Sequence, residues 1–263
     1  MNGFEVFMQF LGVIITIGSF VYAAVFLWPL GRPRSARTAI PYDMQALRRK
    51  YAKYQKVDSL LTLFVALPMA VAVAWGFVES MAALSYWYWR PEGTVVAKTM
   101  NWGIWIIPSI FYAIPVLGAR AAFFWRLWFR KDFAEWMDYG VLTSGIDLRA
   151  AMRMLIVVCV LVATLITLGL LNSASRVTPQ SLFVRSAVRF GERQYALDRI
   201  SEIRRTKTFI AAVGREIPDY TSTFKDGATW STQGWPKEVN PAVLEADREF
   251  VEYISRQSSV PIQ

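Results

Sequence analysis

The side chains that most often carry catalysis or metal binding are nearly absent from this sequence. It contains no histidine and one cysteine, Cys159. Imidazole-ligated haem, HExxH zinc sites and nucleophiles paired with histidine are therefore excluded, as is a disulfide within the chain. The sequence also lacks a GxxxxGK[ST] or GxGxxG phosphate-binding loop. We expect no cofactor and no metal site.

Carboxylates are the remaining candidates for acid–base chemistry. One of three hypotheses for the function is an enzyme that uses Glu79 and Glu92 near the outer membrane surface. Glu79 and Arg120 are the charged residues that come closest to the apolar stretches, but both fall at the ends of those stretches, where a long side chain reaches water. No constellation of residues favours catalysis, so we expect a protein that is not an enzyme.

Basic residues are concentrated in YDMQALRRKYAKYQKV, residues 42–57, a segment that can continue as a helix into the next apolar stretch. They are Arg48, Arg49, Lys50, Lys53 and Lys56. Each basic side chain near an anionic lipid surface contributes about 1 kcal/mol. The cluster is therefore a candidate anionic-lipid contact. The alternative is that its charge serves only to orient the chain in the membrane.

The stretch YTSTFKDGATWST, residues 220–232, predicts a β-hairpin that turns at Asp226-Gly227. A three-residue loop with Gly227 in the left-handed conformation pairs Phe224 with Ala228. In this register one face carries Tyr220, Ser222, Phe224, Ala228 and Trp230. The other face carries Thr221, Thr223, Thr229 and Ser231. We prefer it to a two-residue turn because it separates an apolar face from a polar one.

Four residues of this region are candidates for binding a protein partner. Thr221, Thr223 and Thr229 share the polar face of the hairpin, and Trp235 follows in a polar loop, residues 233–239. An exposed tryptophan in such a loop is a natural anchor for an interface. The alternative is that Trp235 folds back over the domain and belongs to its core.

Long apolar stretches dominate the first two thirds of the chain. Hydrophobic residues make up 54% of the sequence and charged residues 19%, which is below the quarter usual in soluble proteins. A helix needs about 20 apolar residues to cross the bilayer core. Charge-free stretches of this length predict four transmembrane helices, at about 6–31, 59–78, 99–119 and 154–175. The first is expected to be retained, because its pattern is not that of a cleavable signal peptide.

Basic residues between the spans predict their orientation. Arg32, Arg34 and Arg37 join the basic cluster in the first connection. The third connection contains Arg126, Arg130, Lys131 and Arg149, whereas the second contains Arg90 and Lys98. Because basic connections stay in the cytoplasm, the N-terminus and everything after residue 175 are expected outside it.

Three prolines, Pro68, Pro108 and Pro115, fall within the second and third spans. A proline in a membrane helix usually kinks it, and neighbouring groups take up the freed carbonyl. The second hypothesis for the function is therefore a lipid- or solute-handling protein with a cavity bordered by these two proline-kinked helices.

The composition changes near residue 176, where a transmembrane domain over 1–175 gives way to a domain over 176–263. Short strands are predicted at 181–185, 194–197, 200–204 and 209–213, before the hairpin. Asn240 can cap a helix that begins at Pro241. An apolar stripe follows along that helix at Val243, Ala246, Phe250 and Ile254. This order predicts an α+β domain, a small barrel or curved sheet closed by one helix.

Parts of this region resemble the pleckstrin-homology-like (PH-like) domains found at the ends of small multi-pass membrane proteins of bacteria. The resembling segments are LFVR at 182–185, YALDRISEIR at 195–204, YTSTFKDGATW at 220–230 and EFVEYISRQSSVPI at 249–262. The resemblance implies a seven-stranded, helix-capped barrel used for binding, in a protein of the bacterial inner membrane. It carries over no catalytic residues.

PH-like domains elsewhere bind phosphoinositides through basic loop residues. The candidates here are Arg189, Arg193, Arg199, Arg204, Arg205 and Lys207. Glu192, Asp198 and Glu202 interleave with them, which is typical of a solvated strand face.

These features favour a non-catalytic membrane protein whose outer domain binds a protein partner or a second copy of the chain. Such a protein is a scaffold, an assembly factor or a regulatory subunit of a membrane complex. Membrane lipids are also expected partners. Nucleic acid is not, because aromatic residues do not interleave with basic ones as in a nucleic-acid platform.

Overall fold

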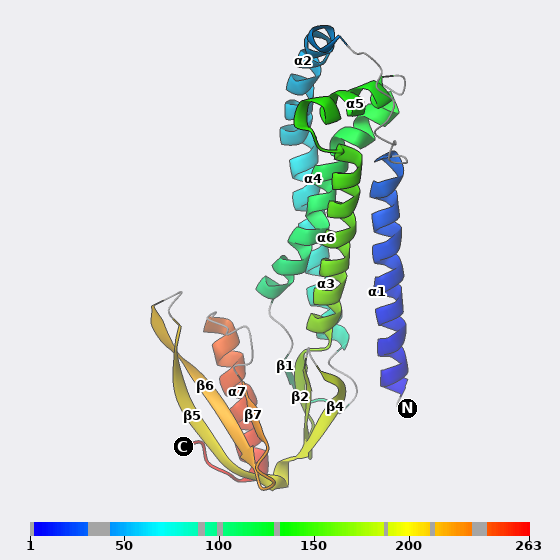
Figure 1. Ribbon diagram of the computed structural model, residues 1–263. Helices are drawn as coiled ribbons and strands as arrows, with labels where there is room; N and C mark the ends of the chain where they lie inside the picture. The colour runs from blue at the N-terminus through cyan, green and yellow to red at the C-terminus, as the bar shows by residue number, and fades with distance from the viewer. Residues whose placement is uncertain are drawn as a thin grey trace. The chain divides into compact units, whose positions relative to one another are not determined.

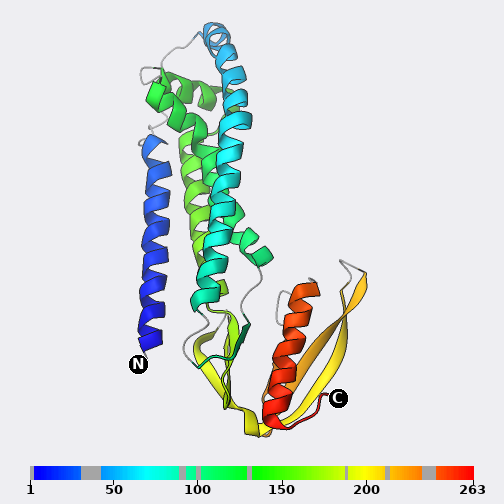
Figure 2. The same ribbon diagram turned by 180° about the vertical axis from the view of Figure 1, so that it is seen from behind.

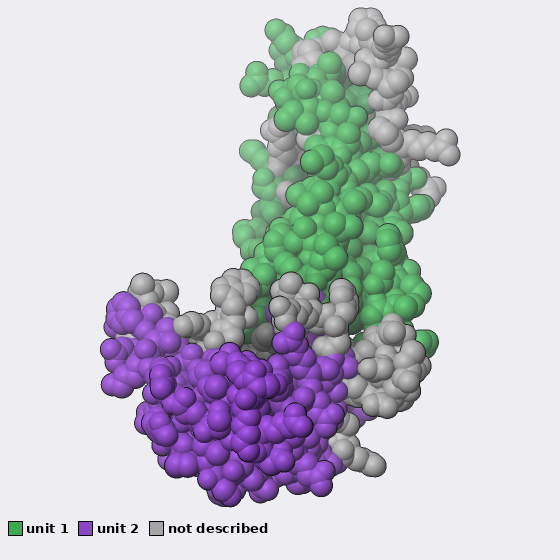
Figure 3. Space-filling view, turned by 60° about the horizontal axis from the view of Figure 1, so that its bottom comes forward, with its two compact units in different colours: residues 1–80, 103–168 green, residues 81–102, 169–263 purple. Residues whose placement is uncertain are grey.

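The computed structural model describes residues 3–30, 43–88, 93–98, 102–128, 132–186, 189–210, 214–232 and 241–263. The chain divides into two compact units, which are coloured separately in Figure 3. The first unit comprises residues 1–80 and 103–168, and the second comprises residues 81–102 and 169–263. Each unit is therefore built from two separate segments of the chain.

The first unit is helical (Figure 1). Its helices are α1 (Gly3–Leu27), α2 (Met44–Leu61), α3 (Leu67–Tyr88), α4 (Ile106–Trp128), α5 (Phe133–Ser144) and α6 (Leu148–Leu171), and the ends of α3 and α6 extend into the second unit. Short 3-10 turns occupy Trp28–Leu30 and Trp102–Trp105.

Three helical segments of the described chain are long and apolar enough to cross a membrane. They are Phe10–Leu27, Gln45–Trp87 and Arg149–Leu171, and they include much of the predicted spans at 6–31, 59–78 and 154–175. The predicted span at 99–119 coincides with a shorter apolar helix, Gly103–Gly118. A membrane protein with three such helices is therefore compatible with the structure.

The helix expected over the basic segment is present and continues into the next apolar helix. Asp43 caps α2, because its carboxylate accepts hydrogen bonds from the backbone N–H groups of Gln45 and Ala46. A π-helical turn, Thr62–Ala66, joins α2 to α3, and the N–H of Leu67 donates to the carbonyl of Thr62. Pro68 follows directly, so the irregular turn falls where a proline disrupts regular hydrogen bonding.

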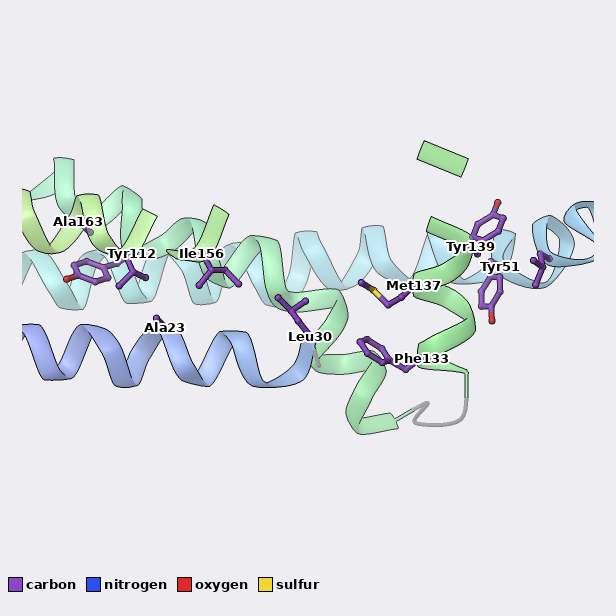
Figure 4. Close-up of a cluster of buried hydrophobic side chains, with 11 residues drawn as sticks. Ala23, Leu30, Tyr51, Tyr112, Phe133, Met137, Tyr139, Ile156 and Ala163 are labelled. Atoms are coloured by element: carbon purple, nitrogen blue, oxygen red, sulfur yellow. The ribbon is translucent and has the colours of Figure 1, made fainter. Parts of the chain in front are cut away.

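Buried apolar side chains from five of these helices form one core (Figure 4). In one part of it, Ala23 of α1 and Tyr112 of α4 lie near Ile156 of α6. In the other part, the Tyr51 ring of α2 stacks on Tyr139 of α5 with centroids 5.3 Å apart. The core therefore continues from the apolar helices into the amphipathic pair α2 and α5.

Two antiparallel sheets and the helix α7 make up most of the described part of the second unit (Figures 1 and 2). The first sheet is ordered β1 (Val96–Lys98), β2 (Ala174–Val177), β3 (Ser181–Ser186) and β4 (Arg189–Ala196). The second is ordered β5 (Ile200–Ile210), β6 (Arg215–Phe224) and β7 (Thr229–Ser231), and α7 spans Pro241–Ser258. Strand β1 comes from the connection between α3 and α4, where no strand was predicted.

Two boundaries differ from the sequence prediction. The predicted start of the outer domain at residue 176 falls inside β2, which pairs with β1 from Val96 to Lys98. The predicted strand at 200–204 is the first part of β5, an 11-residue strand that also takes in residues 209 and 210. Residues 211–213, the rest of the predicted strand at 209–213, lie outside the described part of the chain.

The predicted hairpin register is confirmed. The N–H of Phe224 donates to the carbonyl of Ala228 at 2.8 Å, and Gly227 has a φ of +80°. Thr223 lies opposite Thr229, and Ser222 opposite Trp230. Alternation along β6 buries Tyr220, Ser222 and Phe224, which places the threonines on the other face.

One side of α7 closes the core of this unit, with one departure from the predicted stripe. Phe250, Val251 and Ile254 are buried against residues of both sheets. Ala246, a predicted core position, is exposed, and its neighbour Asp247 is buried instead. The helix therefore turns a carboxylate toward the interior.

Candidate functional site

The three predicted threonines lie together on one face of β6 and β7, which we call the threonine face (Thr221, Thr223, Thr229 and Ser231). Thr221 lies opposite Ser231, as Thr223 lies opposite Thr229. Thr229 is exposed and the other three are half-buried. The structure therefore brings these three candidates together, as the hairpin register predicts.

Charged residues border the threonine face. Arg204 and Glu202 of β5 lie opposite Thr221 and Thr223, and the Arg204 guanidinium donates to the Glu202 carboxylate at 2.9 Å. Asp219 accepts a hydrogen bond of 2.6 Å from the Ser231 hydroxyl. The face thus presents hydroxyls and charges of both signs on a sheet, a chemistry suited to hydrogen bonding with a polar surface.

A recess of about 240 Å³ lies near the turn of the hairpin, and sequence reasoning missed it. Its lining includes Tyr195 and Phe224, whose rings stack with centroids 4.4 Å apart, and the polar residues Arg199 and Asp226. Tyr195 and Asp226 are distant in sequence and meet only because β4 and the hairpin converge. Trp235, the fourth partner-binding candidate, lies outside the described residues.

A buried ion pair joins the two segments of the second unit. The Lys98 ammonium of β1 lies 2.5 Å from the Asp247 carboxylate of α7 and also donates to the carbonyl of Thr232. The side chain of Asp247 is 2% exposed and that of Lys98 is 23% exposed. A buried carboxylate is costly unless it is paired, so this contact couples β1 to the closing helix.

The residues of the basic cluster in α2 differ in whether they form ion pairs. Arg48, Arg49 and Lys56 are exposed, as expected of residues that contact lipid headgroups. Lys50 instead lies 3.1 Å from Asp132 and 2.8 Å from Glu135 of α5. Lys50 is exposed like its neighbours in the cluster, but its charge is therefore already paired with acidic side chains at the start of α5. The side chain of Lys53 lies outside the described part of the structure.

A groove of about 430 Å³ lies between α1 and α6. Most of its lining is apolar, and Phe20, Leu161 and Leu165 are among its exposed side chains. Its volume falls within the range of pockets that bind small molecules. Pro68, Pro108 and Pro115 do not line it, so this groove is not the cavity that the prolines predicted.

A chain of hydroxyl groups borders this groove inside the bundle. Ser19 of α1 is 2.7 Å from the Tyr112 hydroxyl of α4, which is 3.2 Å from the Thr164 hydroxyl of α6. Tyr22 donates to the backbone carbonyl of Tyr112. These residues could not be joined from sequence, because the hydroxyls of Ser19, Tyr112 and Thr164 come from three different apolar helices.

The structure describes one of the two carboxylates of the enzyme hypothesis. Glu79 is an exposed residue of α3, and Glu92 lies outside the described residues. The side chain of Arg120 in α4 also lies outside them. The enzyme hypothesis therefore gains no geometric support.

No family model, curated protein or solved structure matched this chain. The resemblance to PH-like domains therefore stays a prediction.

Proposed function

We propose that this chain is a non-catalytic protein of the bacterial inner membrane whose outer, PH-like domain binds a protein partner. Four spans with both the N-terminus and the outer domain outside the cytoplasm agree with the basic connections, and the apolar part of α4 provides the fourth. Seven strands in sheets of four and three, closed by a C-terminal helix, support the PH-like part of the proposal.

The observation that carries the proposal is the threonine face on a domain that is built into the membrane protein. β1 lies in the connection between α3 and α4, and β2 begins three residues after the end of α6. Chain connections at both places join the domain to apolar helices, so a partner bound to it is held beside the membrane. This arrangement suits a scaffold, an assembly factor or a regulatory subunit.

Photo-crosslinking in cells tests this proposal. With p-benzoylphenylalanine in place of Thr221, Thr223 or Thr229, irradiation should give one discrete product, because a bound partner covers this face. The same crosslinker at Glu249, an exposed position of α7, is the matched control and should give none.

The mass of the product identifies the kind of partner. A product of twice the chain mass indicates a second copy, and any other discrete mass indicates a different protein. Absence of a product at all three threonines, or the same products at Glu249, would refute a binding role for this face.

The groove between α1 and α6 favours a second candidate function, lipid handling. Its apolar lining suits an acyl chain, and the hydroxyls of Ser19 and Thr164 lie at its wall. Ala24→Trp places a large side chain in the groove, whereas Ala72→Trp changes an exposed alanine of α3 that does not line it.

Native mass spectrometry from mild detergent should detect lipid bound to the Ala72→Trp control and to the unaltered chain. Overfilling a packed site costs about 1–3 kcal/mol, and 1.4 kcal/mol is about tenfold in affinity. Ala24→Trp should therefore weaken lipid retention by about tenfold. Equal retention by the two tryptophan variants would eliminate this groove as a lipid site.

A further inference from the structure

Strands β5 and β6 form a ribbon whose far half leaves the core of the second unit. Ile203 is buried in that core, and residues 205, 207 and 209 follow it on the same face of β5. Next to the core, the backbone of Gln263 forms hydrogen bonds with the backbones of Ile203 and Arg205. Beyond that point the face that holds Ile203 becomes exposed, at Arg205, Lys207 and Phe209. We call these three residues the ribbon face.

The ribbon face combines an exposed aromatic ring with two cations. Phe209 is 64% exposed, and among the described residues of 169–263 it is the one large apolar side chain that is exposed. The opposite face differs at this end of the ribbon, where Ile217, across from Thr208, is 1% exposed. An apolar side chain beside basic ones is the pattern of a segment that lies at a lipid surface.

One acidic residue, Glu216, lies across from Phe209 on this same face, and two cations against one carboxylate leave the face with a net positive charge. Lys207 lies 3.4 Å from Glu216, but both side chains are more than half exposed. Exposed ion pairs of this kind contribute little and are exchanged readily for other partners. Arg205 lies over the Tyr220 ring at 5.9 Å, a contact that leaves its charge in place.

The chain enters the second unit directly from an apolar helix. Apolar α6 ends at Leu171 and β2 begins at Ala174. Figures 1 and 2 show the end of β5 and the start of β6 at the same end of the second unit as the start of β2. If α6 crosses the bilayer, as proposed above, the chain leaves the membrane at the start of β2.

We propose that the ribbon face binds the surface of an anionic phospholipid bilayer. Phe209 lies among the glycerol and upper acyl groups, and Arg205 and Lys207 contact the headgroup phosphates. The site rests on α6 crossing the membrane but not on partner binding by the threonine face, which is formed by other residues. It would fix the orientation of the outer domain on the membrane that anchors it.

A single fluorescent label tests this inference in the full chain. Cys159 is the one cysteine, so Cys159→Ala leaves Phe209→Cys as a unique site for the apolar dye NBD. The labelled protein is placed in nanodiscs that contain phosphatidylglycerol or only phosphatidylcholine, each doped with nitroxide-bearing lipid. Because the nitroxide quenches on contact, quenching at residue 209 should be strong in phosphatidylglycerol and several-fold weaker in phosphatidylcholine.

Adding salt and removing the two basic side chains should each reduce this quenching. Raising the salt from about 0.1 M to 1 M shortens the Debye length from about 10 Å to 3 Å and should reduce quenching in phosphatidylglycerol. Arg205→Gln with Lys207→Gln should reduce it at low salt. Absence of quenching at residue 209, or equal quenching in both lipids, would overturn the proposal.

Two further labels separate this inference from the function on which it rests. Leu161→Cys, on the exposed side of α6, should be quenched in both lipids if α6 crosses the bilayer. Thr223→Cys, on the threonine face, should be quenched in neither. Quenching at residue 161 but not at 209 rejects the ribbon site alone, whereas no quenching at 161 rejects the membrane placement as well.

Discussion

Lys98→Ala should destabilise the outer domain by about 3 kcal/mol, at the lower end of the range for removing one member of a buried ion pair. The Asp247 carboxylate is 2% exposed and would stay buried without its partner. Because 1.4 kcal/mol is about tenfold, amide protection in β6 and α7 should fall by about a hundredfold. Hydrogen–deuterium exchange of the full-length protein measures this protection, since a fragment over 176–263 lacks Lys98.

The companion variants make this prediction specific. Asp247→Ala should cost less than Lys98→Ala, because the Lys98 ammonium can reach water along its flexible stem. Replacing both residues, as in Lys98→Met with Asp247→Leu, should recover most of the stability, since apolar side chains can replace a buried pair. Arg248→Ala, which removes an exposed cation one residue from Asp247, should change little. If Lys98→Ala behaved like Arg248→Ala, the pair would have no structural role.

Asp247 is a buried position of α7 that the sequence prediction assigned to its neighbour Ala246. The predicted stripe ran through Val243, Ala246, Phe250 and Ile254, which were chosen because they are apolar and recur at helical spacing. Asp247 has the same helical spacing from Val243 and Phe250, and the structure buries it. An acidic residue within an apolar stripe indicates a buried cation, but the identity of that cation depended on a strand 149 positions away in the sequence.

Elements with local signals were predicted correctly. The Asp226-Gly227 turn, the register of its two strands and the start of α7 at Pro241 each depend on a few neighbouring residues. β1 was missed because it has three residues, and it is a strand only through its pairing with β2. A strand of three residues is too short to show the alternation of apolar and polar residues that predicts a strand.

The groove and its hydroxyl chain also depend on contacts between distant parts of the chain, so they could not have been predicted from the sequence. Ser19, Tyr112 and Thr164 are separate polar residues in three apolar helices, and single hydroxyls are common there. Their contact depends on the rotation of each helix about its axis. Pro68, Pro108 and Pro115 are conspicuous in the sequence, yet the groove forms on α1 and α6, which contain none of them.

Gly227→Val should also weaken the outer domain, by about 1–3 kcal/mol, the cost of holding a residue other than glycine in a strained backbone region. Gly227 has a φ of +80°, and a side chain added there would meet nothing within 4 Å. The cost is therefore conformational, because a β-branched residue resists positive φ. Exchange protection of the amides in β6 and β7 should fall by about tenfold to a hundredfold.

Gly227→Asn is the matched control, because asparagine adopts the left-handed conformation more readily than other residues with a side chain. Both variants add a side chain to the same open space, so a steric or solvent effect would act on the two alike. Only the conformational cost distinguishes them, and Asn should therefore retain most of the protection that Val loses. Equal protection in the valine variant and the unaltered chain would mean that residue 227 does not require positive φ. The assignment of a three-residue loop, which determines which residues lie on the threonine face, would then be wrong.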